Sequence, residues 1–246
     1  MARYKVILIY DGTAFHGMQR QASDRTVQGE VEGALRKIGW QGNSLTAAGR
    51  TDQGVHASGQ VIAFDLDWRH SHLDLQNALN AALPADVSVK NVETAAEGFH
   101  PRYDAAARIY RYQIFCQPQR DPLRERYAWR VWPALDFDQL KKAASQLPGS
   151  HDFAAFGRPL KPNGPTTRNV FSAEWVWEGQ DALAFVVSAN AFLYHMVRRM
   201  VLIQVEIGQG RYPVEVITEY LTGQRHGMIQ GLAPPQGLHL EQVLYE

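Results

Sequence analysis

The residues best suited to perform chemistry lie in the stretch AGRTDQGVHASGQ, residues 48–60. It holds an arginine, an aspartate, a histidine and three glycines between two apolar runs, 45–48 and 60–64, that we predict to be strands. A hairpin turn needs only one or two Gly, Asn or Asp residues. Residues two apart in an extended chain point to the same side, so Arg50 is expected beside Asp52, where it would keep the carboxylate ionised. Such a pair could also simply pin a loop.

Composition bounds the class of protein. A chain of 246 residues can form one large domain or two ordinary ones, and 45% hydrophobic with 20% charged residues describes a soluble globular protein. The longest apolar run, 192–207, is interrupted by charged residues and does not predict a membrane span. The start lacks a signal-peptide pattern, so we expect the cytoplasm. A single cysteine, Cys116, and the absence of an HxxxH spacing predict neither a disulfide nor a metal site.

Charge is zero overall but unevenly distributed. Residues 102–130 hold seven arginines against three acids, and 153–173 hold three basic residues with no acid. Residues 61–100 reverse this balance, with six acids against two basic residues. The segregation predicts one basic face for a nucleic acid.

Periodicity predicts the elements that position these residues. In the first half we expect a strand at 3–10, a helix capped by Thr26 and ending at Gly39, the two strands around 48–60, a helix at 73–83 and a strand at 87–92. In the second half we expect a strand at 106–116, a helix at 137–147, strands at 169–177 and 183–189, a helix at 190–207 and a strand at 239–244. Both halves read β-α-β-β-α-β. The sequence therefore predicts an α+β fold of two RRM/ferredoxin-like halves, 1–104 and 105–246, with their sheets joined around a central catalytic cleft.

Two of these elements carry unusual side chains. On the strand RIYRYQIF, Arg108, Tyr110 and Tyr112 share one side, a surface that can stack on a base and pair with a phosphate. We assign packing to Tyr112 and function to Tyr110. The 190–207 helix is apolar almost all round, so Arg198 and Arg199 require explanation. One can reach solvent along its stem, and the other is expected to meet a phosphate or a carboxylate such as that of Asp52.

The motifs GRTDQGVHASGQ, RIYRY, SHDFAAFG and NAFLYHMVRRMV, in this order, resemble those of the TruA family of tRNA pseudouridine synthases. YDGTAFHGMQRQ and GLHL extend the resemblance over the whole chain, although Met18 stands where the family usually has Trp. The resemblance implies that Asp52 is the catalytic aspartate, that Arg50 pairs with it, that Tyr110 stacks on the target uracil, and that Arg198 completes the ion pairs around Asp52. It also implies a homodimer that acts on uridines in the anticodon stem-loop of tRNA.

The implied reaction breaks the bond from C1′ to N1, turns the base and rejoins it through C5, without a cofactor. Asp52 could attack C1′, add to C6, or remove a sugar proton, and the sequence leaves these three roles open. The uridine must be flipped from its stem, so basic residues must bind the flanking backbone. The expected substrate-binding residues, besides Tyr110 and Leu238 of GLHL, are Arg20, Arg25, Arg102, Arg108, Arg111, Lys161 and Arg168.

Two other functions deserve comparison. A non-catalytic RNA-binding protein of two RRM-like units would use the aromatic strand, but it would give Asp52 and its motif no role. A hydrolase with Asp52 as nucleophile would need a partner acid or a metal, and the sequence supplies neither.

Overall fold

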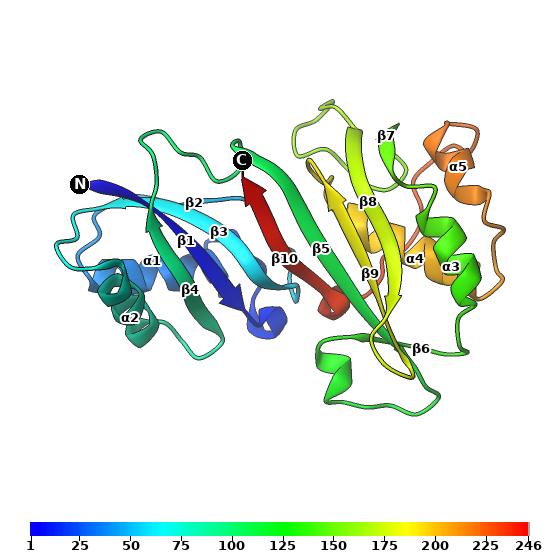
Figure 1. Ribbon diagram of the computed structural model, residues 1–246, viewed down its shortest axis with the longest axis horizontal. Coiled ribbons are helices and arrows are strands. Elements are labelled where there is room, and N and C mark those ends of the chain that lie inside the picture. Colours follow the sequence, from blue (N-terminus) through cyan, green and yellow to red (C-terminus); the bar gives the residue numbers. More distant parts are fainter. Residues whose placement is uncertain (246) are drawn as a thin grey trace. The chain divides into compact units, whose positions relative to one another are not determined.

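The computed structural model describes residues 1–245 and consists of two compact units. Unit 1 comprises Met1–Ala106 together with the C-terminal strand from His239 onward, and unit 2 comprises Ala107–Leu238 (Figure 1). The first boundary lies close to the one predicted, but the last strand belongs to unit 1. There, His239 and Leu240 pair in parallel with His56 and Ala57. Strand periodicity does not reveal the pairing partner of a strand, which is why the sequence placed this one with its neighbours in the chain.

Unit 1 contains the predicted β-α-β-β-α-β order, followed by the returning strand. Its elements are β1 Ala2–Tyr10, the 3₁₀ turn η1 Gly12–Ala14, α1 Val27–Lys37, β2 Thr46–Ala47, β3 His56–Leu66, α2 His72–Ala82, β4 Val87–Thr94 and β10 Leu238–Tyr245. The sheet order is β4-β1-β3-β10, with β2 added to β3. β1 is antiparallel to both β3 and β4, whereas β10 is parallel to β3. Figure 1 shows α1 and α2 on the same side of this sheet.

The local sequence explains these elements. β1 alternates buried and partly exposed residues because its apolar side faces the core. The helix α1 begins where the hydroxyl of Thr26 accepts a hydrogen bond from the Gly29 N–H, as predicted. The helix α2 begins with a capping box between Ser71 and Asp74. β3 is buried along nearly its whole length, so it forms the centre of the unit 1 core.

Unit 2 follows the β-α-β-β-α part of the predicted order, with short additions. Its elements are β5 Ala105–Cys116, which begins at the end of unit 1, η2 Arg124–Arg126, β6 Trp129–Val131, α3 Phe137–Ala144, β7 Gly149–Asp152, β8 Thr167–Trp177, β9 Ala182–Ala189, α4 Met196–Gly208, α5 Val216–Leu221 and η3 Pro235–Gly237. The antiparallel order is β5-β9-β8-β7, and β6 pairs in parallel with β5. The α+β class is thus confirmed, while the joining of the two sheets around a cleft stays a prediction.

The helix α4 begins later than expected. Residue 195, a histidine with a left-handed φ of 67°, precedes Met196, so the segment from Asn190 is not helical. Instead, Tyr194 forms a β-bridge with Arg158. The rest of α4 is largely buried, and its Gln204 accepts a hydrogen bond of 2.8 Å from the indole of Trp175. The sequence reasoning extended the apolar pattern backward, because periodicity does not detect a left-handed residue.

No helix in residues 1–245 is both long enough and apolar enough to cross a membrane. Within the same range, no three His, Cys, Asp or Glu side chains form a group that could hold a metal ion.

Candidate active site

Asp52 lies in the connection between β2 and β3, where the chain makes a tight turn. Its carbonyl oxygen accepts a hydrogen bond of 3.2 Å from the Val55 N–H, and Gly54 between them has a φ of +76°. A positive φ at the third position is the mark of a type II turn and favours glycine there. The Asp52 side chain is half-buried. The turn therefore places a partly exposed carboxylate immediately before the most buried strand of unit 1.

The segment after β1 holds this turn from one side. The N–H of Met18 donates to the carbonyl of Thr51 at 3.0 Å, and the carbonyl of Phe15 accepts from Gly54 at 3.3 Å. Gly12 lies so close that a Cβ there would stand 2.0 Å from the carbonyl oxygen of Val55. These contacts fix the backbone on both sides of Asp52. The YDGTAFHGMQRQ motif is thus a support for the Asp52 turn.

Buried polar side chains hold the turn from the other side. The hydroxyls of Tyr10 and Thr51 are 2.8 Å apart, and the side-chain amide of Gln60 donates to the carbonyl of Gly49 at 3.0 Å. Burial raises the pKa of Tyr10 to about 12, so its phenol stays neutral near pH 7. The sequence reasoning missed these three positioning residues. Tyr10 and Gln60 could have been found as polar residues at inward positions of apolar strands.

Arg50 lies two residues before Asp52, in the segment that leads into the turn. It is exposed, and among residues 1–245 no hydrogen bond or ion pair joins it to Asp52. The prediction assumed an extended chain, but residues 48–55 are not a strand and Asp52 begins a turn. Residues two apart therefore need not point to the same side, and the pairing of Arg50 with Asp52 stays a prediction.

The two tyrosines of the aromatic strand of unit 2 differ in burial. Tyr112 is completely buried and donates a hydrogen bond of 2.7 Å to the carbonyl of Pro234, and burial raises its pKa well above the usual value. Tyr110 is half-buried, and its ring meets Phe192 edge-on with 5.1 Å between centroids. Arg108 is buried and donates to the carbonyl of Asn190 at 2.7 Å. The packing role of Tyr112 is confirmed.

Both arginines of α4 are half-buried, so neither simply extends into solvent. Arg198 donates from Nε to the carbonyl of Ala233 at 2.8 Å, and Arg199 donates in the same way to Ile229 at 3.0 Å. Burial, and then the charges of Arg158 and Arg198, lower the pKa of Arg199. The two guanidinium groups hold the segment 229–233 against α4, a structural role that the sequence reasoning did not foresee.

Residues 6–104 and 143–246 match the family described as tRNA pseudouridine synthase. This chain belongs to that family.

Relatives with the same name align with this pseudouridine synthase over its whole length. The tRNA pseudouridine synthase A of Listeria welshimeri is 40% identical over 248 residues, and that of Thermotoga neapolitana is 39% identical over 246 residues. Each alignment covers 100% of both chains. A solved structure, the archaeal box H/ACA sRNP Nop10-Cbf5 complex, matches 83% of this chain and 44% of that chain at 12% identity, with a TM-score of 0.40.

Three of the synthase's expected phosphate ligands are engaged by carboxylates. Arg25 grips Asp86 with two hydrogen bonds of 2.7 and 2.9 Å and stacks over Phe15. Arg20 contacts Glu32, and Arg111 contacts Glu178, each at 2.5 Å. These arginines therefore have carboxylate partners within the protein.

The remaining predicted ligands of the synthase differ in accessibility. Arg102 and Lys161 are exposed, whereas Leu238 is buried. Arg168 donates to the carbonyls of Pro165 and Thr167, and its Nε is buried without a hydrogen-bond partner in residues 1–245. Burial lowers the pKa of Arg168. Exposure thus favours Arg102 and Lys161 as contacts to RNA.

The pair of Arg25 and Asp86 predicts how the synthase responds to acid. Hydrogen bonds from Arg25 lower the pKa of Asp86, so the pair stabilises the fold fully above pH ~4 and loses this effect as the pH falls through the lowered pKa. The difference in unfolding free energy between wild type and Asp86→Asn, measured by urea titration, should therefore shrink below pH ~4. Asp67→Asn, at an exposed residue, serves as the control. An Asp86→Asn difference as large at pH ~2 as at pH ~7 would contradict the assignment.

Proposed function

We propose that this enzyme isomerises uridine to pseudouridine in the anticodon stem-loop of tRNA, without a cofactor and with Asp52 as the catalytic residue. Family membership over the whole chain supports the reaction and the substrate class. The observation that carries the assignment to Asp52 is the turn itself. A half-buried carboxylate stands in a backbone held from one side by Phe15 and Met18 and from the other by Tyr10 and Gln60.

A fixed carboxylate suits each role open to Asp52. Attack on C1′, addition to C6 and removal of a sugar proton all require an ionised oxygen at a set distance from a flipped nucleotide. Holding the group in place beforehand removes an entropic cost from the reaction step, and misplacement by about 1 Å can cost about a hundredfold in rate. Asp52 is partly exposed, so a flipped nucleotide can reach it.

Other residues take supporting roles in the proposal. Tyr110 is half-buried, lies nearly perpendicular to Phe192, and supplies the aromatic ring that stacks on the uracil in this proposal. Arg198 is ordered by its bond to Ala233, which fixes the direction of its guanidinium for an anionic partner. Arg50 is exposed and has no carboxylate partner in residues 1–245, so its charge is available to a phosphate of bound tRNA.

The proposal includes a cytoplasmic homodimer. Trp132 and Trp177 are each more than half exposed, which is unusual for so large an apolar side chain and is typical of interface residues. Light scattering on the protein as it elutes from a size-exclusion column measures the mass of the assembly. A mass of one chain at micromolar concentration would remove the dimer from the proposal.

Release of the C5 hydrogen tests the function directly. The base is rejoined through C5, so each turnover replaces the C5–H bond and releases tritium from tRNA labelled at that atom. Nucleoside mapping of the product then locates the modified positions. No release would overturn the proposed reaction, and product confined to other parts of the tRNA would overturn the anticodon stem-loop as the site.

Tyr110 provides a sharper test of the stacking role. Tyr110→Ala removes the ring, so kcat/KM should fall by roughly 5–150-fold, the range given by 1–3 kcal/mol of base stacking. Tyr110→Phe keeps the ring and should retain most of the activity. Thermal unfolding of both variants serves as the control. Equal losses in the two variants would show that the hydroxyl, and not the ring face, is what the enzyme uses.

A further inference from the structure

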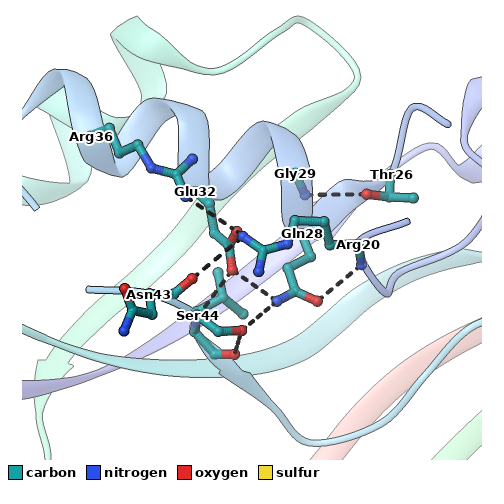
Figure 2. A network of polar contacts seen from close by, with 9 residues as sticks. Arg20, Thr26, Gln28, Gly29, Glu32, Arg36, Asn43 and Ser44 are labelled. Atoms are coloured by element: carbon teal, nitrogen blue, oxygen red, sulfur yellow. Dashed lines mark hydrogen bonds and ion pairs between the residues drawn. The ribbon is translucent and has the colours of Figure 1, made fainter. Parts of the chain in front are cut away.

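A fully buried carboxylate lies on α1, away from the Asp52 turn. Glu32 is 0% exposed, and its Oε1 accepts hydrogen bonds from the side chain of Gln28 at 2.8 Å and from the Leu45 N–H at 3.2 Å. Its Oε2 accepts from the guanidinium of Arg20 at 2.5 Å (Figure 2). Arg36, one turn further along the helix, approaches the same oxygen at 3.7 Å. A charge so deeply buried is tolerated only with such partners.

The network fixes Arg20 at two points. Its guanidinium is held by Glu32, and its backbone N–H donates to the side-chain oxygen of Gln28 at 3.1 Å. The amide nitrogen of Gln28 also donates to the hydroxyl of Ser44 at 2.9 Å. Figure 2 shows how these side chains join α1 to two loops, one at Arg20 and one at Asn43 and Ser44. We call Glu32, Gln28 and Arg20 the loop clamp.

Both of these loops lead to the Asp52 turn. Met18, two residues before Arg20, is buried, and its carbonyl accepts from the Gln28 N–H at 2.9 Å while its own N–H donates to Thr51 at 3.0 Å. The other loop continues from Leu45 through β2 into residues 48–52. Met18 therefore links the loop clamp directly to Thr51, the residue before Asp52. A displacement of the clamp side chains would move the Asp52 turn through this link.

We propose that Glu32 is a positioning residue for catalysis, acting through Arg20 and Gln28 on the Asp52 turn, and that Arg20 is part of this clamp instead of a ligand for phosphate. This inference rests on the proposed function of Asp52. The physical reason is the sensitivity of the reaction step to the placement of the carboxylate. The contacts of the clamp are with the two loops and not with Asp52, so in this proposal it affects the chemical step and not the binding of tRNA.

Glu32→Gln and Arg20→Gln test this with the tritium-release assay on the full chain. Glu32→Gln keeps the shape and removes the charge, and each variant should lower kcat by roughly 10–100-fold. KM and its salt dependence should stay within about twofold of wild type, because no phosphate contact is lost. Arg20→Lys should restore part of kcat. The kcat of the double variant, Glu32→Gln with Arg20→Gln, should be no lower than that of the less active single variant, because the two residues act as a unit.

Arg36→Gln is the matched control, because Arg36 faces the same carboxylate at 3.7 Å and the only loop contact of its side chain in residues 1–245 is a distant one, with its guanidinium 5.8 Å from the centre of the Trp40 ring. It should leave kcat within about twofold of wild type. If Glu32→Gln does not fold, as judged by thermal unfolding, Arg20→Gln still decides the question, because Arg20 lies at the partly exposed end of the network.

Two outcomes would overturn the inference. A raised KM with a weaker salt dependence in Arg20→Gln would make Arg20 a phosphate ligand. An unchanged kcat in both folded variants would leave the clamp a purely stabilising feature. Failure of the proposed function would look different, because wild type itself would then release no tritium.

Discussion

Replacing Asp52 by asparagine is expected to stop pseudouridine formation while leaving tRNA bound. Asparagine has nearly the same size, and the turn depends on the backbone carbonyl of residue 52, so the fold of the loop should persist. What is lost is the negative charge that attack on C1′, addition to C6 or proton removal requires. Loss of a residue in any of these roles costs about a thousandfold or more in kcat.

Single-turnover tritium release measures the rate of pseudouridine formation, and filter binding measures the affinity for tRNA. Asp67→Asn, an exposed aspartate on the same unit, is the control and should behave like wild type. Because asparagine can deamidate to aspartate, Asp52→Ala should be measured alongside. Product formation by the alanine variant at a rate near that of wild type would remove Asp52 from the mechanism.

Gly12→Ala is expected to destabilise unit 1 and to abolish most activity. The added methyl group would stand 2.0 Å from the carbonyl oxygen of Val55, and a backbone atom cannot move aside as a flexible side chain can. The segment after β1 would have to shift, which would strain the hydrogen bonds from Gly12 to His56 and from Gly54 to Phe15. Overpacking of this kind costs about 3 kcal/mol of unfolding free energy.

Gly33→Ala is the matched comparison for this prediction. Gly33 lies inside α1, and a Cβ there meets no atom within 4 Å. Alanine should therefore raise stability by about 0.5–1 kcal/mol through its better helix propensity. Urea unfolding followed by circular dichroism measures both variants. A Gly12→Ala protein as stable and active as Gly33→Ala would show that the close approach at Val55 does not constrain the site.

Much of the fold was predictable because the responsible patterns are local. The alternation in β1, the cap at Thr26 and the apolar stripe of α1 lie within a few residues of what they determine. The start of α4 was not predictable in this way. It is set by the left-handed backbone conformation of residue 195, which no local residue pattern indicates. The partner of β10 also depends on residues far away in the chain.

The sequence alone determined the family and the reaction class, and it singled out Asp52 as the candidate catalytic residue, because a motif records chemistry directly in residue types. Only the tertiary structure decided what surrounds that residue. It places Asp52 in a turn held through Tyr10, Gln60 and Met18. It also gave Arg20 and Arg25 carboxylate partners. The physical reason is that a side chain's partner depends on distance in space, and charge patterns along the chain do not record that distance.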